Sequence, residues 1–126
     1  STYATAVACL AGYDAHNMLP ALTPYSIMRL GPVALTPYHP PGDPRLGEEI
    51  ALVAAKHHCV LLANHGPIVA APTLAAAVYA AEELEETAKL YITLMNHQPR
   101  LLTPAQIDEL KQKFSTAGDP DAKTCC

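Results

Sequence analysis

Charged residues are scarce in this sequence, and basic residues are the scarcer kind. Only 16% of the 126 residues are charged, and eight Lys and Arg stand against twelve Asp and Glu, which gives a net charge of −4. No run of basic residues occurs that could neutralise the backbone of a phosphate polymer. The composition therefore argues against a nucleic-acid partner.

Long apolar runs are also missing. No uninterrupted apolar span reaches the roughly 18 residues that a membrane helix needs. The opening segment, residues 2–12, has small side chains but lacks the Lys or Arg flank of a signal peptide. We therefore expect a soluble, cytoplasmic protein with no membrane partner.

Several catalytic signatures are absent as well. The sequence contains no glycine-rich phosphate loop, no G-x-S-x-G elbow, no H-E-x-x-H pair and no Walker sequence. No cysteine pair has the spacing of a zinc ribbon. These absences leave the histidines as the candidates for chemistry.

Apolar residues, by contrast, are abundant. They make up half of the sequence, and the mean hydropathy is +0.10. A chain of this length folds as one domain and buries roughly two thirds of its extended surface. The apolar fraction is high for a soluble monomer and favours apolar surface that a partner covers, so we expect a homo-oligomer.

The four cysteines are divided between the body of the chain and its end. Cys9 and Cys59 lie in apolar segments, which predicts buried free thiols. Cys125 and Cys126 end a polar tail, residues 115–126, that we expect to be disordered. A terminal Cys-Cys pair is similar to the doubly prenylated ends of Rab-type GTPases, but nothing else here resembles a GTPase, and the role of the pair stays open.

Apolar spacing and capping residues predict alternating helices and strands. Asp43 and Pro44 mark a helix start, because aspartate accepts from free backbone amides and proline suits the first helical position. The segment Thr103 to Gln106 matches a capping box. We predict helices over 3–11, 44–58 and 73–95, and a last short helix that follows the capping box and runs through Ile107, Leu110 and Phe114. Strands are predicted over 33–35, 59–63 and 68–71, and proline-rich loops through most of 13–45.

Two of these helices carry an apolar stripe. The acidic run Glu82–Glu86 lies largely off the second stripe, with Glu85 four residues before Lys89, and we interpret it as a solvated face rather than as paired catalytic carboxylates. The stripes consist of Leu46, Ile50, Val53 and Ala54 in the first helix, and of Leu74, Ala77, Val78, Ala81, Leu84, Ala88, Tyr91, Ile92 and Met95 in the second.

The order of elements predicts an α/β domain. Three strands are too few to make a covered sheet by themselves. We therefore expect the missing strands to lie before Ser1.

His65 stands where the chain reverses between two predicted strands, in LLANHGPIVAA. Gly66 is free to adopt a positive φ at this turn. A single histidine in a turn is more often a hydrogen-bonded structural residue than a metal ligand, and the residues alone leave both interpretations open. The other histidines belong to no recognisable group of metal ligands or catalytic residues. His57 and His58 lie at a helix end, and His16, His39 and His97 lie in loops.

Four segments resemble a known family over nearly all of residues 1–110. They are STYATAVACL, LPALTPYSIMRLG, PYHPPGDPRL and LLANHGPIVAAPTLAAAVYAAEELEETAKLY. In this order they are similar to the C-terminal part of the class II aldolase/adducin family, and within it to the branch of 3-oxo-tetronate 4-phosphate decarboxylases. The resemblance implies an incomplete three-layer α/β/α fold with a mainly antiparallel central sheet over residues 1–114.

The resemblance also implies a metal site. Family members bind a divalent ion through a His-x-His motif and a third histidine in a later N-H-G turn. His65 of Asn64-His65-Gly66 matches the third ligand, and the His-x-His would fall immediately before Ser1. The implied cofactor is Zn²⁺ or another divalent ion, and the phosphate-binding residues are likewise expected before Ser1.

The implied activity is that of a carbon–carbon lyase. In the decarboxylase branch, loss of CO₂ from a 3-oxo-tetronate 4-phosphate leaves a metal-stabilised enediolate, which becomes dihydroxyacetone phosphate. Related aldolases protonate the carbanionic carbon with a tyrosine from the neighbouring subunit of a tetramer, and Tyr25 matches it. A free phenol ionises only near pH 10 and needs local electrostatic help to act as an acid or base, so Tyr25 as a partly buried aromatic residue on a proline-rich loop stays an open alternative. Tyr38 and His39 are weaker candidates.

Alternatives within the family remain open. Class II sugar-phosphate aldolase or epimerase chemistry would use the same site, and an adducin-like scaffold would keep the fold without a metal. A single imidazole cannot hold catalytic zinc, so we expect residues 1–126 alone to be inactive. The resemblance does not identify the sugar acid.

Overall fold

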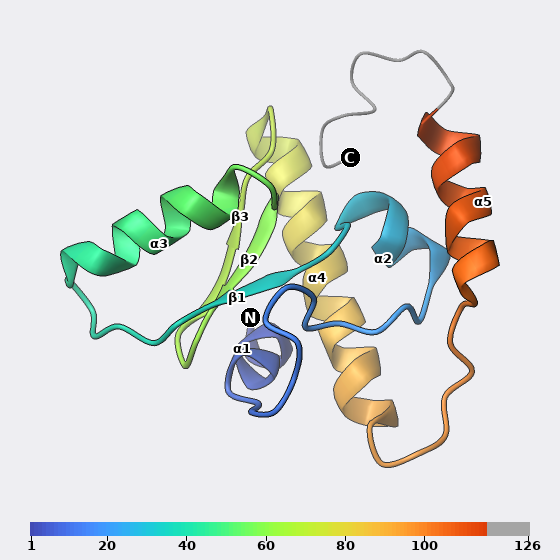
Figure 1. The fold of residues 1–126 in the computed structure, drawn as a ribbon, viewed down its shortest axis with the longest axis horizontal. Helices are drawn as coiled ribbons and strands as arrows, with labels where there is room; N and C mark the ends of the chain where they lie inside the picture. Colours follow the sequence, from blue (N-terminus) through green and yellow to red (C-terminus); the bar gives the residue numbers. More distant parts are fainter. Residues whose placement is uncertain (116–126) are drawn as a thin grey trace.

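The computed structural model describes residues 1–115 and shows a small sheet covered by helices on both faces (Figure 1). This confirms the predicted α/β class, although several boundaries differ from the expected ones. The elements are α1 (Thr2–Ala8), α2 (Pro24–Arg29), β1 (Ala34–Thr36), α3 (Pro44–Ala54), β2 (Cys59–Leu62), β3 (Gly66–Val69), α4 (Leu74–Leu94) and α5 (Pro104–Ser115).

The three strands lie in the order β1-β2-β3. β1 runs parallel to β2, with Thr36 opposite Leu62, and β2 pairs antiparallel with β3, with Leu62 opposite Gly66. The carboxyl ends of β1 and β2 therefore meet at the edge of the sheet where the chain reverses at residues 63–65.

The helices form a layer on each face of this sheet. α3 packs on β1 and β2, whereas α1 and α4 pack on the other face against the β2–β3 hairpin. α2 and α5 contact each other beside α4, and Figure 1 shows them on the side away from α3. The core lies mainly between α1, α4 and the sheet; its fully buried residues include Ala4, Val7, Cys59, Leu61, Leu84 and Ala88.

Both predicted helix caps are present. The Asp43 carboxylate accepts from the backbone N–H of Arg45 at 2.9 Å. The Thr103 hydroxyl accepts from the N–H of Gln106 at 3.2 Å, and the Gln106 side chain accepts from the N–H of Thr103 at 2.9 Å, which completes the capping box. Local sequence signals therefore located these helix starts correctly.

Two helices end earlier than predicted. α1 stops at Ala8 rather than at residue 11. α3 stops at Ala54, because the carbonyl of Val53 accepts from the N–H groups of both Lys56 and His57 and tightens the last turn. The His57 ring then contacts the carbonyl of Pro32 at 3.0 Å.

Some predicted burial is wrong. Cys9 is exposed, because it follows the last residue of α1 where the chain leaves the core, whereas Cys59 is buried as expected. Leu74 and Val78 of the predicted stripe on α4 are 83% and 47% exposed, and the buried residues of α4 are Ala80, Leu84, Thr87 and Ala88. No residue of α3 is fully buried, so the apolar side chains predicted to form its stripe stay at least partly exposed to solvent.

Other predictions fall partly outside the described residues. Ser115, the first residue of the predicted tail, is the last residue of α5; the rest of the tail, residues 116–126 with Cys125 and Cys126, lies outside the described residues and stays a prediction. Within residues 1–115, no helix has the length and apolar character needed to cross a bilayer.

The acidic run on α4 does more than form a solvated face. The Glu85 carboxylate accepts from the Ser1 hydroxyl at 2.8 Å and from the backbone N–H groups of Tyr3 and Ala4 at 2.9 Å each. These amides belong to the first turn of α1, whose own N-cap residue makes no side-chain capping bond. Glu85 therefore caps α1 from a helix more than eighty residues away in the sequence.

The pKa of Glu85 is lowered from 4.5. Partial burial alone would raise it, but the hydrogen bonds from Ala4, Tyr3 and Ser1 outweigh the burial. Because the folded-state pKa is depressed, the stabilisation is fully present above the unfolded value near 4.5 and is lost as the pH falls through the folded value.

We expect Glu85→Gln to lower the free energy of unfolding by about 1 to 3 kcal/mol at pH 7, because the charge-assisted bonds to α1 are weakened. The difference from the unchanged protein should begin to shrink below about pH 4.5 and disappear once the pH is below the depressed folded-state pKa, where both carry a neutral side chain. Urea denaturation at several pH values measures it. Glu86→Gln, at an exposed neighbour, is the control and should have little effect. Equal losses for the two variants would contradict the assignment.

The β2–β3 reversal uses unusual backbone conformations. Asn64 has φ +59° and Gly66 has φ +149°. A Cβ at Gly66 would lie 3.2 Å from the Thr5 hydroxyl oxygen, so both the backbone and the packing against α1 favour glycine.

Gly66→Ala should destabilise the fold by about 1 to 3 kcal/mol, because alanine is strained at this φ and meets Thr5. Gly47→Ala is the matched control: it adds the same methyl group inside α3, where nothing lies within 4 Å, and should stabilise by about 0.5 to 1 kcal/mol. Thermal melts of both variants measure the effects. The two variants should change the melting temperature in opposite directions. A higher melting temperature for both would show that a side chain at position 66 does not strain the turn.

A candidate metal centre at the β2–β3 turn

His65 is the last residue of the three-residue loop between β2 and β3. Its backbone N–H donates to the carbonyl of Leu62 at 2.9 Å, which closes the turn. The side chain is half-buried. A hydrogen-bonded reversal between paired strands holds the imidazole on a rigid part of the fold.

The turn is tied to α1 on both sides of His65. Before it, the N–H of Asn64 donates to the carbonyl of Ala8 at 3.1 Å. After it, Gly66 packs against the Thr5 side chain. The Thr5 hydroxyl in turn donates to the carbonyl of Ser1 at 2.6 Å. Two short contacts therefore lead from the turn to the first residue of the chain.

The ring of Tyr38 lies against the His65 imidazole. The two ring centroids are 6.0 Å apart, and the planes are nearly perpendicular at 84°, an edge-to-face arrangement. Tyr38 follows β1, whose carboxyl end lies beside that of β2. The parallel pairing of these strands is what brings the two rings together.

Buried polar atoms without partners occur near Tyr38 in the sequence. The Thr36 hydroxyl and Nε2 of His39 are buried and have no hydrogen-bond partner among residues 1–115. Thr36 is opposite Leu62, three residues before His65. Buried polar groups normally find a partner in protein, water or a ligand, so this part of the sheet edge has unused hydrogen-bonding capacity.

His65 fits the role of one metal ligand, but the described residues do not complete a site. Across the described part of the chain, the imidazole makes its ring contact with Tyr38 and no side-chain hydrogen bond that would occupy a ring nitrogen. No group of three His, Cys, Asp or Glu within residues 1–115 is arranged to hold an ion. A tetrahedral centre needs further ligands, which would have to come from outside these residues.

Tyr25 lies on a different part of the molecule. It belongs to α2, which Thr23 caps, and its side chain is 59% exposed. The Arg29 guanidinium lies 5.6 Å from the centre of its ring. In Figure 1 the β2–β3 turn is at the lower left beside α1, whereas α2 is at the right beside α5. One copy of the chain therefore does not bring Tyr25 to His65.

A groove between α2 and α5 runs beside Tyr25. It has a volume of about 440 Å³ and includes Met28 and Phe114, which are 38% and 46% exposed. The high apolar content of the sequence predicts exposed apolar surface that a partner could cover, and this groove has such surface.

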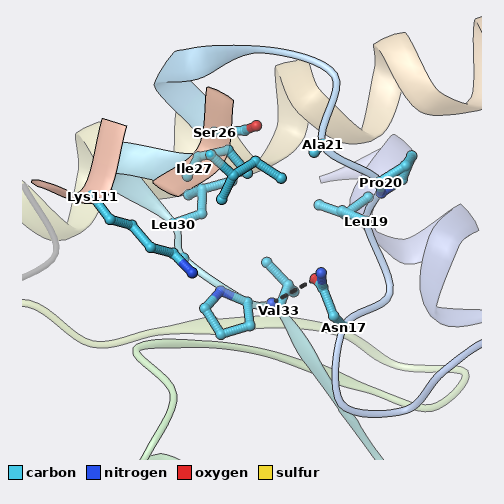
Figure 2. Close-up of a pocket in the computed structure, with 12 residues that line it drawn as sticks. Asn17, Leu19, Pro20, Ala21, Ser26, Ile27, Leu30, Val33 and Lys111 are labelled. Atoms are coloured by element: carbon cyan, nitrogen blue, oxygen red, sulfur yellow. Dashed lines mark hydrogen bonds between the residues drawn. The ribbon is translucent and has the colours of Figure 1, made fainter. Parts of the chain in front are cut away.

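A second cavity, shown in Figure 2, was not predicted from the sequence. It measures about 240 Å³ and lies between the 17–21 segment, α2 and α5. The Asn17 side chain accepts from the N–H of Val33 at 3.3 Å, and Figure 2 shows the Lys111 amine pointing toward these residues. Its lining residues come from separate segments with no common motif, so no local signal could have revealed it.

Comparisons with known proteins identify the family of the chain. Residues 1–92 match the model of the class II aldolase and adducin N-terminal domain. The chain is 49% identical over 110 residues to the 3-oxo-tetronate 4-phosphate decarboxylase of Pectobacterium atrosepticum, which is 87% of this chain and 50% of the relative. It is 31% identical over 117 residues to the L-fuculose phosphate aldolase of Escherichia coli K12, covering 90% of this chain and 54% of the relative.

A solved structure shows the same fold. YgbL of Klebsiella pneumoniae, described as a candidate aldolase, epimerase or decarboxylase, superposes with a TM-score of 0.85 at 46% identity, over 87% of this chain and 53% of that chain. The chain spans about half the length of the curated relatives it matches. From the matched model over residues 1–92 and these relatives, the chain belongs to the class II aldolase and adducin family.

Proposed function

We propose that this chain is the C-terminal part of a metal-dependent carbon–carbon lyase, which removes CO₂ from a 3-oxo-tetronate 4-phosphate and yields dihydroxyacetone phosphate. The observation that carries the proposal is the His65 imidazole, held at a rigid reversal with no side-chain hydrogen bond to the described residues. The 49% identity to a decarboxylase of this substrate class supports the choice of reaction.

His65 contributes the third imidazole of the ion site. Its backbone N–H bond to Leu62 and the two contacts of the turn with α1 fix the direction of the ring. The contact of α1 with the turn also brings the peptide that would precede Ser1 to the same side of the fold. Two histidines located there in a longer polypeptide would lie beside His65 and complete three ligands.

The reaction breaks the bond between the carboxylate carbon and C2 of the substrate. CO₂ leaves, the bonding electron pair remains on the adjacent carbon as an enediolate, and a proton then adds to that carbon. A divalent ion, Zn²⁺ by the preference for imidazole ligands, would stabilise the negative charge that develops on the oxygens. The chain's task is to fix the geometry and to supply the proton.

Tyr25 supplies the proton from a second copy of the chain. Its phenol is exposed on α2, where it can reach a neighbouring copy, and the Arg29 guanidinium lies 5.6 Å from the centre of its ring. The exposed apolar groove beside Tyr25 would be covered by the neighbouring subunit of a tetramer. We infer that the enzyme works in the cytoplasm.

Aldolase or epimerase activity is the second candidate. The 31% identity to L-fuculose phosphate aldolase favours it, because a retro-aldol step leaves the same kind of enediolate. A metal-free, adducin-like scaffold is the third candidate. The His65 side chain makes no hydrogen bond within residues 1–115, which leaves it available for an ion and argues against a scaffold without a metal.

His65→Ala should abolish metal retention in a polypeptide that continues upstream of Ser1 through the two proposed histidines. Two remaining ligands bind zinc too weakly to keep it through gel filtration. Elemental analysis of the purified protein measures about one zinc per subunit before the change and almost none after it. His97→Ala, at an exposed histidine outside the site, is the control and should retain the metal. Unchanged zinc in His65→Ala would refute the assigned ligand.

Tyr25→Phe should lower the rate of dihydroxyacetone phosphate formation by about 10²- to 10⁴-fold in the same extended protein, because it removes the donor that protonates the enediolate but keeps the ring. Tyr79→Phe, another exposed tyrosine, should leave the rate unchanged. The assay follows dihydroxyacetone phosphate with a coupled dehydrogenase.

Mixing the two inactive variants tests whether Tyr25 acts across a subunit boundary. Oligomers that contain both His65→Ala and Tyr25→Phe chains would form some sites with an intact histidine from one chain and an intact tyrosine from the other. Activity should therefore return after co-refolding. No recovery, in mixed oligomers verified by mass spectrometry, would place both residues in one chain or exclude Tyr25.

A further inference from the structure

We propose that Glu85 is a positioning residue for the site at the β2–β3 turn. Its carboxylate fixes the start of α1, and α1 fixes the His65 imidazole relative to the residues that would precede Ser1. The part of this inference that concerns metal binding rests on the proposed function.

The first step is the cap itself. Glu85 accepts three hydrogen bonds, all between 2.8 and 2.9 Å, from Ser1, Tyr3 and Ala4. A helix of seven residues has little stability of its own, and α1 has no side-chain cap from its own N-cap residue. The orientation of α1 therefore depends on α4 through this carboxylate.

The second step leads from α1 to the turn. The Thr5 hydroxyl connects the carbonyl of Ser1 to Gly66, and the carbonyl of Ala8 accepts from Asn64. These contacts flank His65 on both sides. A shift of α1 along its axis must therefore move the backbone that carries the imidazole.

Neighbouring acidic residues of α4 do not share this role. Glu83 pairs with Arg29 of α2 at 3.3 Å, on another side of the helix. Glu82 and Glu86 are exposed, and within residues 1–115 neither contacts α1 through a hydrogen bond. Glu85 therefore differs from the other acidic residues of this run in its hydrogen bonds to α1, a difference that the sequence does not reveal.

The consequence concerns ligand geometry. Metal ligands must be held to within about half an ångström, and loss of a supporting residue outside the ligand shell typically weakens metal binding by about 10- to 100-fold. If Glu85 sets the distance between the start of α1 and the turn, it sets the distance between two groups of ligands that belong to different segments.

The decisive experiment measures zinc affinity in the protein extended upstream of Ser1, by competition with a chromophoric chelator. Glu85→Gln should weaken zinc binding about 10-fold or more. Thr103→Ala is matched to it, because it also removes a helix cap, but on α5 away from the turn, and its zinc affinity should not change. Equal zinc affinities for the two variants would overturn the proposal.

A second measurement separates this inference from the proposed function. In the 126-residue chain, two-dimensional amide spectra should show Glu85→Gln shifting the signals of Asn64, His65 and Gly66, whereas Glu86→Gln leaves them in place. Unshifted signals would overturn the positioning role whatever the metal result. If the extended protein binds no zinc at all, the proposed function fails, and the amide signals still decide the role of Glu85.

A third variant covers the case in which Glu85→Gln does not fold. Thr5→Val preserves the size of the side chain but removes its hydrogen bond to Ser1. It should also shift the amide signals of the turn and weaken zinc binding. Wild-type values for both would contradict the path from α1 to His65.

Discussion

The packing of α1 between α4 and the β2–β3 hairpin is the interaction on which the candidate site depends. Ala4 and Val7 are completely buried there, and Ala8 is almost so. Small side chains on this face let the helix approach both neighbours closely, and Leu84 of α4 is buried in the same cluster. Since a helix of this length is not stable alone, its place is set by these contacts rather than by its own propensity.

Local signals in the sequence were enough to locate the helix starts and the reversal that carries His65. The caps at Asp43 and Thr103 depend on residues two or three positions apart, and such short-range geometry is encoded locally. The glycine after His65 likewise marks a backbone conformation that other residues avoid. The α/β class followed from the alternation of these elements.

Contacts between distant segments could not be predicted in the same way. Glu85 caps a helix 81 to 84 residues away, and its sequence context is an ordinary acidic run on an amphipathic helix. Tyr38 meets His65 because β1 lies parallel to β2, a pairing that no motif specifies. The prediction that Cys9 and Leu74 are buried was wrong for a related reason. Apolar periodicity indicates which residues share a face of a helix, but not how far the elements that cover this face extend.

The positions of His65 and Tyr25 constrain how this fold can carry out chemistry. The imidazole lies at the sheet edge beside α1, and the phenol lies on α2 beside α5, on another side of the same chain (Figure 1). A side chain reaches only a few ångströms, and both residues lie on elements packed into the fold. If both act on one substrate, they must therefore come from different copies, and the site must form between subunits. The exposed apolar groove next to Tyr25 then has a physical role, because covering it would provide part of the free energy that holds the subunits in the geometry the reaction needs.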